Sequence, residues 1–130
     1  MTNWERNWCG RVLQEQGVLP TTPVAYALAL LGKEACVAVE RCKGEIQAAL
    51  SDLAQTQQAV ARTTIGTADR ETAQRRESRV LRELRKRRKD LALYQGLVVE
   101  LEGCRELPVE PVAINGRVCW RAPWRVLIQK

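Results

Sequence analysis

The segment TTIGTAD, residues 63–69, decides the fold, because it interrupts a long helical pattern with a minimal turn. Gly66 suits the left-handed position that ends a helix, and Thr67 supplies a hydroxyl that caps the next one. Helical patterns run away from this turn on both sides, over 23–64 and over 68–103. Two long helices joined by so short a turn lie antiparallel. The sequence therefore predicts a long, coiled-coil-like helical hairpin.

Apolar residues repeat every seven positions in both predicted helices, as they do in a coiled coil. The first helix carries Val39, Ile46, Leu53 and Val60, with Ala35, Cys42, Ala49 and Thr56 at the companion positions. The second carries Leu84, Leu91 and Val98, with Ala73, Val80, Arg87, Tyr94 and Leu101. Folding about the turn brings Leu53 to Val80. It also brings Ile46 to Arg87, whose aliphatic carbons are expected to pack against Ile46 while its guanidinium reaches outward.

The two ends of the chain carry shorter elements. Thr2 and Glu5 form a capping-box pattern, which predicts a short helix within residues 1–17. Asn115-Gly116 lies between two runs of alternating polarity, the pattern of a tight β-hairpin. Residues 109–128 are therefore expected to form a hairpin, or a three-stranded sheet if 124–128 adds a strand. The whole chain, 1–130, is predicted to be one mainly α domain.

Composition argues against an enzyme. The chain has no His, which removes the commonest general base and the commonest metal ligand. Its five Cys form no CxxC pair, and no Gly-rich phosphate loop or nucleophile motif is present. We therefore expect no catalytic residues, no metal, no cofactor and no small-molecule substrate.

The sequence shows neither the pattern of a signal peptide nor that of a membrane-spanning helix. Trp4 to Asn7 occupy the place where a signal peptide has its apolar core, and the longest apolar run, Val24 to Leu31, is eight residues. We expect an intracellular protein with reduced thiols, in the cytoplasm or within a virus particle, that does not enter a membrane. A secreted domain held by disulfides is the alternative.

The charge of the chain is concentrated in one segment. Nine of the fifteen residues 75–89 are Arg or Lys and two are Glu, a net charge of +7, whereas the rest of the chain sums to −1. We call the predicted contact between the two long helices the seam. Five of the basic residues are spaced four, three, four and three residues apart along the helix face opposite the seam, and we call these the basic stripe: Arg75, Arg79, Arg82, Lys86 and Lys89. Three more flank it: Arg76, Arg85 and Arg88. Such a field attracts phosphates or acidic surfaces.

The helix that faces the stripe offers few acidic partners. Residues 44–58 contain only Glu45 and Asp52 as carboxylates, so we expect the stripe to stay unneutralised. Its candidate ligands are DNA or RNA, contacted through phosphates, or an acidic protein surface. Two alternatives remain open: a solvated face that keeps the rod soluble, and a nuclear-targeting signal over 85–89.

Apolar and aromatic residues indicate protein contacts. Leu50 and Leu81 widen the apolar face beyond what two helices need, which favours a homo-oligomer. Trp4, Trp8, Trp120 and Trp124 are candidates either for a protein interface or for the core of the open end of the hairpin.

Two functional hypotheses follow. The first is a non-catalytic oligomeric accessory protein that binds nucleic acid through the basic stripe. The alternative is a structural assembly component, such as an adaptor, ring or scaffold protein of a virus particle or secretion-type machine. A helical hairpin followed by short strands broadly resembles the oligomerisation portion of phage genome-packaging small subunits. The 22 residues before the first long helix are too few for the helix-turn-helix module that those proteins usually carry.

Overall fold

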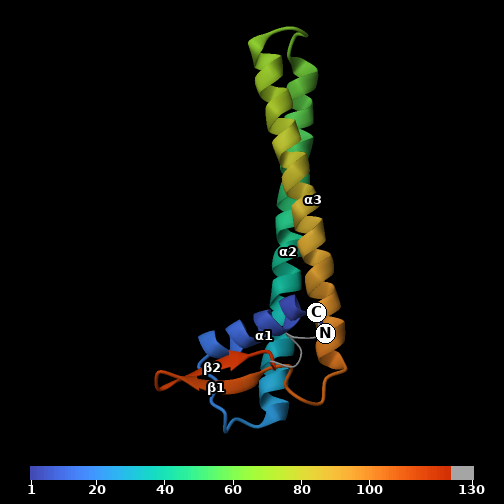
Figure 1. Cartoon of the computed structure of the whole chain (residues 1–130). Coiled ribbons are helices and arrows are strands. Elements are labelled where there is room, and N and C mark those ends of the chain that lie inside the picture. Colours follow the sequence, from blue (N-terminus) through green and yellow to red (C-terminus); the bar gives the residue numbers. More distant parts are fainter. Residues whose placement is uncertain (124–130) are drawn as a thin grey trace. The chain divides into compact units, whose positions relative to one another are not determined.

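The computed structural model of the chain describes residues 1–123 (Figure 1). Its elements are α1 (Asn3–Glu15), α2 (Val24–Arg62), α3 (Ala68–Glu102), β1 (Glu110–Ile114) and β2 (Arg117–Arg121). The two long helices pack against each other, and the strands form a two-stranded antiparallel sheet. The expected fold class, a mainly α protein with a helical hairpin and a small C-terminal sheet, is confirmed. The third strand expected over 124–128 lies outside the described residues.

The chain divides into two compact units that share both long helices. The first, which we call the head, comprises Met1–Val37 and Gln95–Lys130. The second, which we call the rod, comprises Ala38–Tyr94. The rod ends at the turn that the sequence predicts. There Gly66 has φ +84, and the Thr67 hydroxyl accepts the backbone N–H of Arg70 at 3.3 Å.

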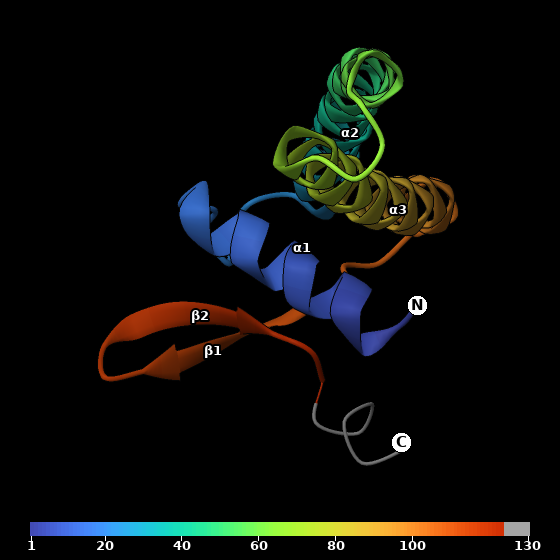
Figure 2. The ribbon, with the colours of Figure 1, turned by 90° about the horizontal axis from the view of Figure 1, so that it is seen from above.

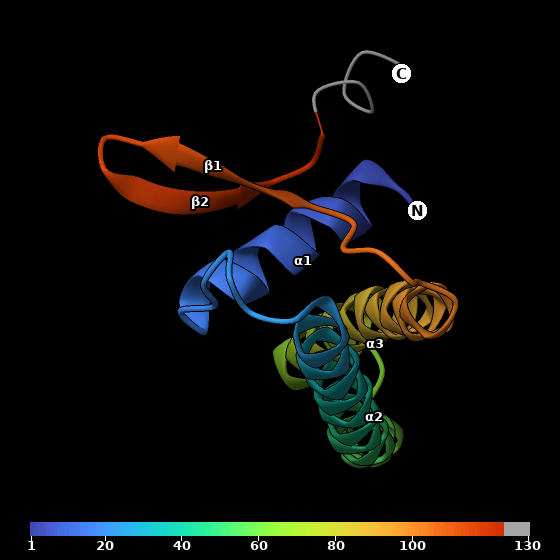
Figure 3. The same cartoon turned by 90° about the horizontal axis from the view of Figure 1, so that it is seen from below.

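The head is built around α1. Thr2 and Glu5 form the expected capping box, with the Glu5 N–H donating to the Thr2 hydroxyl and the Thr2 N–H donating to the Glu5 carboxylate. Seen from opposite ends, α1 lies between the β-hairpin and the head ends of α2 and α3 (Figures 2 and 3). Its inward face supplies Trp8, Cys9, Val12 and Leu13 to a core completed by Ala27, Leu31, Leu97, Leu101, Val109 and Trp120.

The β-hairpin is held directly on α1. Asn115 and Gly116 both have positive φ, +52 and +75, so the turn is the type that an Asn-Gly pair favours. The Trp120 indole N–H donates to the Val18 carbonyl at 3.0 Å. A Cβ on Gly10 would lie 2.5 Å from the Trp120 carbonyl oxygen, closer than van der Waals contact allows. Glycine at this position therefore permits the close approach of α1 and β2.

The rod has a narrow core of small and medium-sized side chains. The residues buried along it are Ala38, Cys42, Thr56, Val80 and Leu84. Those on α2 are Ala38, Cys42 and Thr56, and those on α3 are the larger Val80 and Leu84, a combination that suits closely approaching helices. The Thr56 hydroxyl, although buried, donates to the Asp52 carbonyl at 2.7 Å, so its burial leaves no unsatisfied donor.

Candidate nucleic-acid interface

The basic stripe lies on a single uninterrupted helix. α3 runs from Ala68 to Glu102 without a break, so the geometry that the sequence spacing implies is present over the whole stripe. All five stripe residues are exposed, and so are the flanking residues Arg76, Arg85 and Arg88. From Arg75 to Lys89 the stripe extends about 21 Å along the helix axis.

Two arginines of the basic segment that lie outside the stripe form ion pairs with α2. Arg76 forms an ion pair with Asp52 at 2.5 Å, and Arg87 forms one with Glu45 at 2.7 Å. Arg87 also reaches Glu83 of its own helix at 3.4 Å. The physical reason is position: Arg76 and Arg87 lie beside the seam, where a long side chain spans the gap to the neighbouring helix. The two ion pairs lower the number of unpaired cations in the segment, but neither involves a residue of the stripe.

Arg75 has a weaker partner. Its guanidinium lies 3.8 Å from the Glu71 carboxylate one turn earlier, and both side chains are more than two-thirds exposed. An exposed pair of this kind contributes under about 1 kcal/mol, because water screens the attraction and both side chains lose freedom. A phosphate therefore competes with Glu71 for Arg75 at little cost.

The remaining six basic residues form no ion pair within residues 1–123. They are Arg79, Arg82, Arg85, Lys86, Arg88 and Lys89, and all are exposed. Six cationic groups thus lie within about 15 Å of helix with no carboxylate partner in the described part of the chain. This surface is the strongest candidate site of the molecule.

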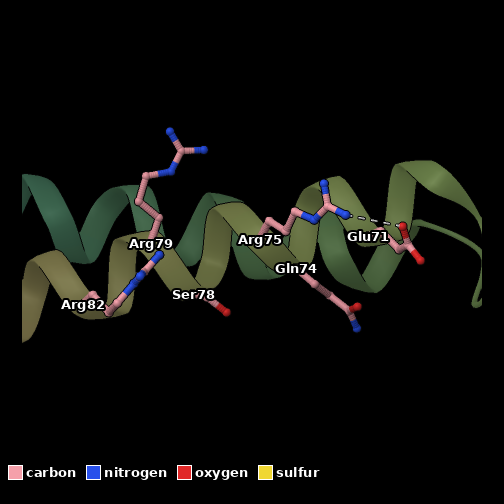
Figure 4. A pocket seen from close by; sticks show the side chains of 6 residues that line it. All are labelled: Glu71, Gln74, Arg75, Ser78, Arg79 and Arg82. Atoms are coloured by element: carbon pink, nitrogen blue, oxygen red, sulfur yellow. Dashed lines mark ion pairs between the residues drawn. The ribbon is translucent and has the colours of Figure 1, made fainter.

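A shallow depression marks the outward surface of α3 near the start of the stripe. It is lined by Glu71, Gln74, Arg75, Ser78, Arg79 and Arg82, all from α3. Arg75 and Arg79 project to one side of the helix, while Gln74 and Ser78 project to the other (Figure 4). Gln74 and Ser78 were not among the predicted site residues. Ser78 lies three residues after Arg75 and four before Arg82, a spacing that was a usable signal, whereas Gln74 has no such spacing.

The tryptophans differ in exposure. Trp8 and Trp120 are each only 7% exposed, and Trp120 uses its N–H within the head, so both belong to the core. Of the two alternatives, core or protein interface, the burial of these two side chains favours the core. Trp4 is 36% exposed. Trp124 lies outside the described residues.

The two leucines assigned to a protein interface remain partly accessible in the rod. Leu81 is 37% exposed and Leu50 is half-buried.

Two of the five cysteines, Cys9 and Cys42, are buried. Burial raises the pKa of the Cys9 thiol to about 12, with smaller contributions from Cys104 and Glu5. Burial also raises the pKa of Cys42. All five thiols are free, and among residues 1–123 no three His, Cys, Asp or Glu side chains gather in a way that could hold a metal ion.

Comparison with protein-family models, with curated proteins and with solved structures finds no match to this chain. Over the described residues, none of the helices combines the length and the apolar character that crossing a bilayer requires. The geometry and the charge of the site itself are therefore the observations that bear on function.

Proposed function

We propose that this chain is a non-catalytic accessory protein that binds the phosphate backbone of nucleic acid through the basic stripe of α3, without sequence specificity. The observation that supports it is the set of six exposed cations on one helix that have no ion-pair partner within residues 1–123. We propose the same protein to be a homo-oligomer that acts inside a cell or within a virus particle.

The energetics of α3 are consistent with a polyanionic ligand. Like charges four residues apart on a helix, such as Arg75 with Arg79 and Arg82 with Lys86, repel by about 0.2–0.5 kcal/mol per pair. A bound phosphate row removes this repulsion and releases the counterions of the nucleic acid. Because contacts to phosphate oxygens carry no sequence information, binding through them would position the protein without selecting a sequence.

Charge reversal tests the proposal. The variant Arg75→Glu, Arg79→Glu, Arg82→Glu, Lys86→Glu should lose binding to a mixed nucleic-acid pool while keeping its helicity by circular dichroism. A matched control reverses four exposed arginines elsewhere: Arg11→Glu, Arg105→Glu, Arg117→Glu, Arg121→Glu. It changes the net charge equally and should retain most of the binding.

Salt dependence provides the quantitative check. If four stripe residues each contact one phosphate, the slope of log K against log salt is about −3.6, which corresponds to roughly a 150-fold loss of affinity between 50 and 200 mM salt. Binding that does not respond to salt would contradict the proposal. So would the absence of binding at low salt, or equal losses in the stripe variant and in the control.

A structural assembly role is the second candidate, because the rod carries exposed apolar side chains. Leu81 and Leu93 are 37% and 41% exposed. In this role the stripe would face an acidic protein surface, and the apolar side chains would contact other subunits. Mass measurement by light scattering at micromolar concentration tests it, since a strictly monomeric protein would argue against both the assembly role and the proposed oligomer.

A further inference from the structure

The basic residues of α3 are arranged in two rows and not in one line. Successive residues of an α-helix are turned by about 100° about its axis, so sequence separation gives each residue's direction. Arg75, Arg79 and Lys86 fall within about 40° of one another on one flank. Arg82 and Lys89 lie about 20° and 40° from Arg75 in the other direction, and Arg85 and Arg88 lie farther round, about 80° and 140° from it, on the opposite flank.

Part of the first flank is drawn in Figure 4. Arg75 and Arg79 leave α3 on the same side, and Gln74 and Ser78 leave it on the other (Figure 4). From Arg79 to Arg88 the basic residues span about 180°, half of the helix circumference. The other half carries the contacts with α2, through buried Val80 and Leu84 and the Arg87–Glu45 ion pair. The outward half of α3 therefore carries all of these basic residues, together with Glu71, Gln74, Ser78 and Leu81.

Two rows of cations match a ligand with two rows of phosphates. A single strand presents one row of phosphates, and one flank of α3 would be enough to follow it. The major groove of B-form DNA is about 12 Å wide, and an α-helix with its side chains measures about 10–12 Å. A helix in that groove has a phosphate backbone on each side.

We propose that the ligand of the basic stripe is B-form duplex DNA, with α3 lying along the major groove and its two rows of cations facing the two phosphate backbones. The inference rests on the proposed function, and it specifies the class of nucleic acid that the stripe binds. The row of Arg75, Arg79 and Lys86 contacts one strand. Arg85 and Arg88 contact the other, while Arg82 and Lys89 face the groove itself.

The chemistry of the surface agrees with a duplex. Proteins that hold single strands stack unpaired bases on aromatic rings, and residues 69–93 contain no aromatic residue. Tyr94, the next residue, is half-buried, and the Arg41 guanidinium lies 6.0 Å from the centre of its ring. An A-form RNA duplex is a poorer match, because its major groove is too deep and narrow for side chains to enter.

The test compares three labelled ligands that carry equal numbers of phosphates: a DNA duplex of about 20 base pairs, a single DNA strand of twice that length and an RNA duplex. Fluorescence anisotropy at low salt should show the DNA duplex bound at least tenfold more tightly than the other two. Equal or tighter binding of the single strand, or of the RNA duplex, would overturn the groove placement.

Row-specific variants test the geometry directly. Arg85→Glu with Arg88→Glu removes one row, and Arg75→Glu with Arg79→Glu and Lys86→Glu removes the other. Each should weaken duplex binding, and the salt slope should become shallower by about 1.8 and about 2.7 respectively. Arg105→Glu with Arg117→Glu and Arg121→Glu is the control in the head, and it should keep the wild-type slope. A two-residue variant with an unchanged slope would show that a single row binds the ligand.

The two levels of the proposal fail in distinguishable ways. If none of the three ligands binds at low salt, the proposed function fails, and the groove placement fails with it. If the single strand binds as tightly as the duplex with a steep salt slope, nucleic-acid binding stands and the duplex assignment fails. Circular dichroism of each variant, which should match the wild type, excludes unfolding as the cause of lost binding.

Discussion

Replacing Gly10 with Ala should destabilise the head, although the same change stabilises most helices. Gly10 lies inside α1, where Ala is favoured over Gly by about 1 kcal/mol. The added methyl group, however, would lie 2.5 Å from the carbonyl oxygen of Trp120 and 3.7 Å from Val109 Cγ1. The atom it meets first belongs to the backbone of β2, which cannot rotate aside as a side chain does.

The magnitude follows from these two opposing effects. Overpacking a filled core costs about 1–3 kcal/mol, and a contact with backbone belongs at the upper end of that range. Subtracting the helix preference of about 1 kcal/mol leaves a net loss of about 2 kcal/mol in the free energy of unfolding. To relieve the contact, α1 and β2 must separate by several tenths of an ångström.

Gly32→Ala and Gly44→Ala are matched controls. Both glycines lie inside α2, and a Cβ on either meets no heavy atom within 4 Å. These variants should gain up to about 1 kcal/mol, so the difference from Gly10→Ala is about 3 kcal/mol. Urea denaturation should be followed by tryptophan fluorescence, because the described tryptophans Trp4, Trp8 and Trp120 all lie in the head. A Gly10→Ala variant as stable as the controls would refute the close packing of α1 on β2.

Three further predictions concern single contacts. Trp120→Phe keeps an aromatic ring but removes the N–H that donates to the Val18 carbonyl. In circular-dichroism melts it should lower the free energy of unfolding by about 1–3 kcal/mol. An unchanged stability would mean that water satisfies this carbonyl equally well. Burial raises the pKa of Cys9 from its ordinary 9.0 to about 12, so the folded state keeps a proton that the unfolded state loses. The free energy of unfolding should therefore fall between pH 9 and pH 12, by about 1.4 kcal/mol per pH unit from this group. In urea titrations Cys9→Ala should show a shallower decline with pH. Parallel pH profiles of the variant and the wild type would contradict the raised pKa of Cys9. A double-mutant cycle of Arg87→Met and Glu45→Gln should give a coupling energy under about 1 kcal/mol, because both side chains are about one-third exposed; a coupling of several kcal/mol would indicate a much drier pair.

The elements of the fold were predictable because their signals are local. Thr2 and Glu5 are three residues apart, so the cap of α1 is visible in the sequence without any knowledge of packing. Gly66 and the Asn115-Gly116 pair need positive φ, and the structure has it at all three residues. Each of these signals involves residues within a few positions of one another.

The packing of the head was not predictable, because it depends on contacts between distant parts of the chain. Gly10 and Trp120 are far apart in sequence, and no local pattern shows that they touch. Trp4 and Trp8 share a helical face by spacing, yet Trp8 is buried and Trp4 is 36% exposed. The two residues differ in exposure because the other elements of the head cover this face of α1 more fully at Trp8 than at Trp4.

The position of the stripe was predictable, and its ion pairs were not. A spacing of four, three, four and three residues defines one helix face once α3 is continuous, which it is. An α2 carboxylate reaches an α3 arginine only where the two residues border the seam on the same side. Asp52 and Glu45 were recognised as the acidic residues facing the stripe, but their pairing with Arg76 and Arg87 required the register and the side-chain directions.

The pattern of paired and unpaired arginines follows from the geometry of two packed helices. Arg76 and Arg87 border the seam, and a guanidinium there reaches a carboxylate across the interface. The stripe residues lie on the side of α3 that faces away from α2. The diameter of α3, about 10 Å, separates them from α2, and an Asp or Glu side chain on α2 does not reach that far. Placing more carboxylates on α2 therefore cannot neutralise the stripe. Neutralisation must come from α3 itself, as Glu71 does weakly for Arg75, or from a molecule that approaches the outward face.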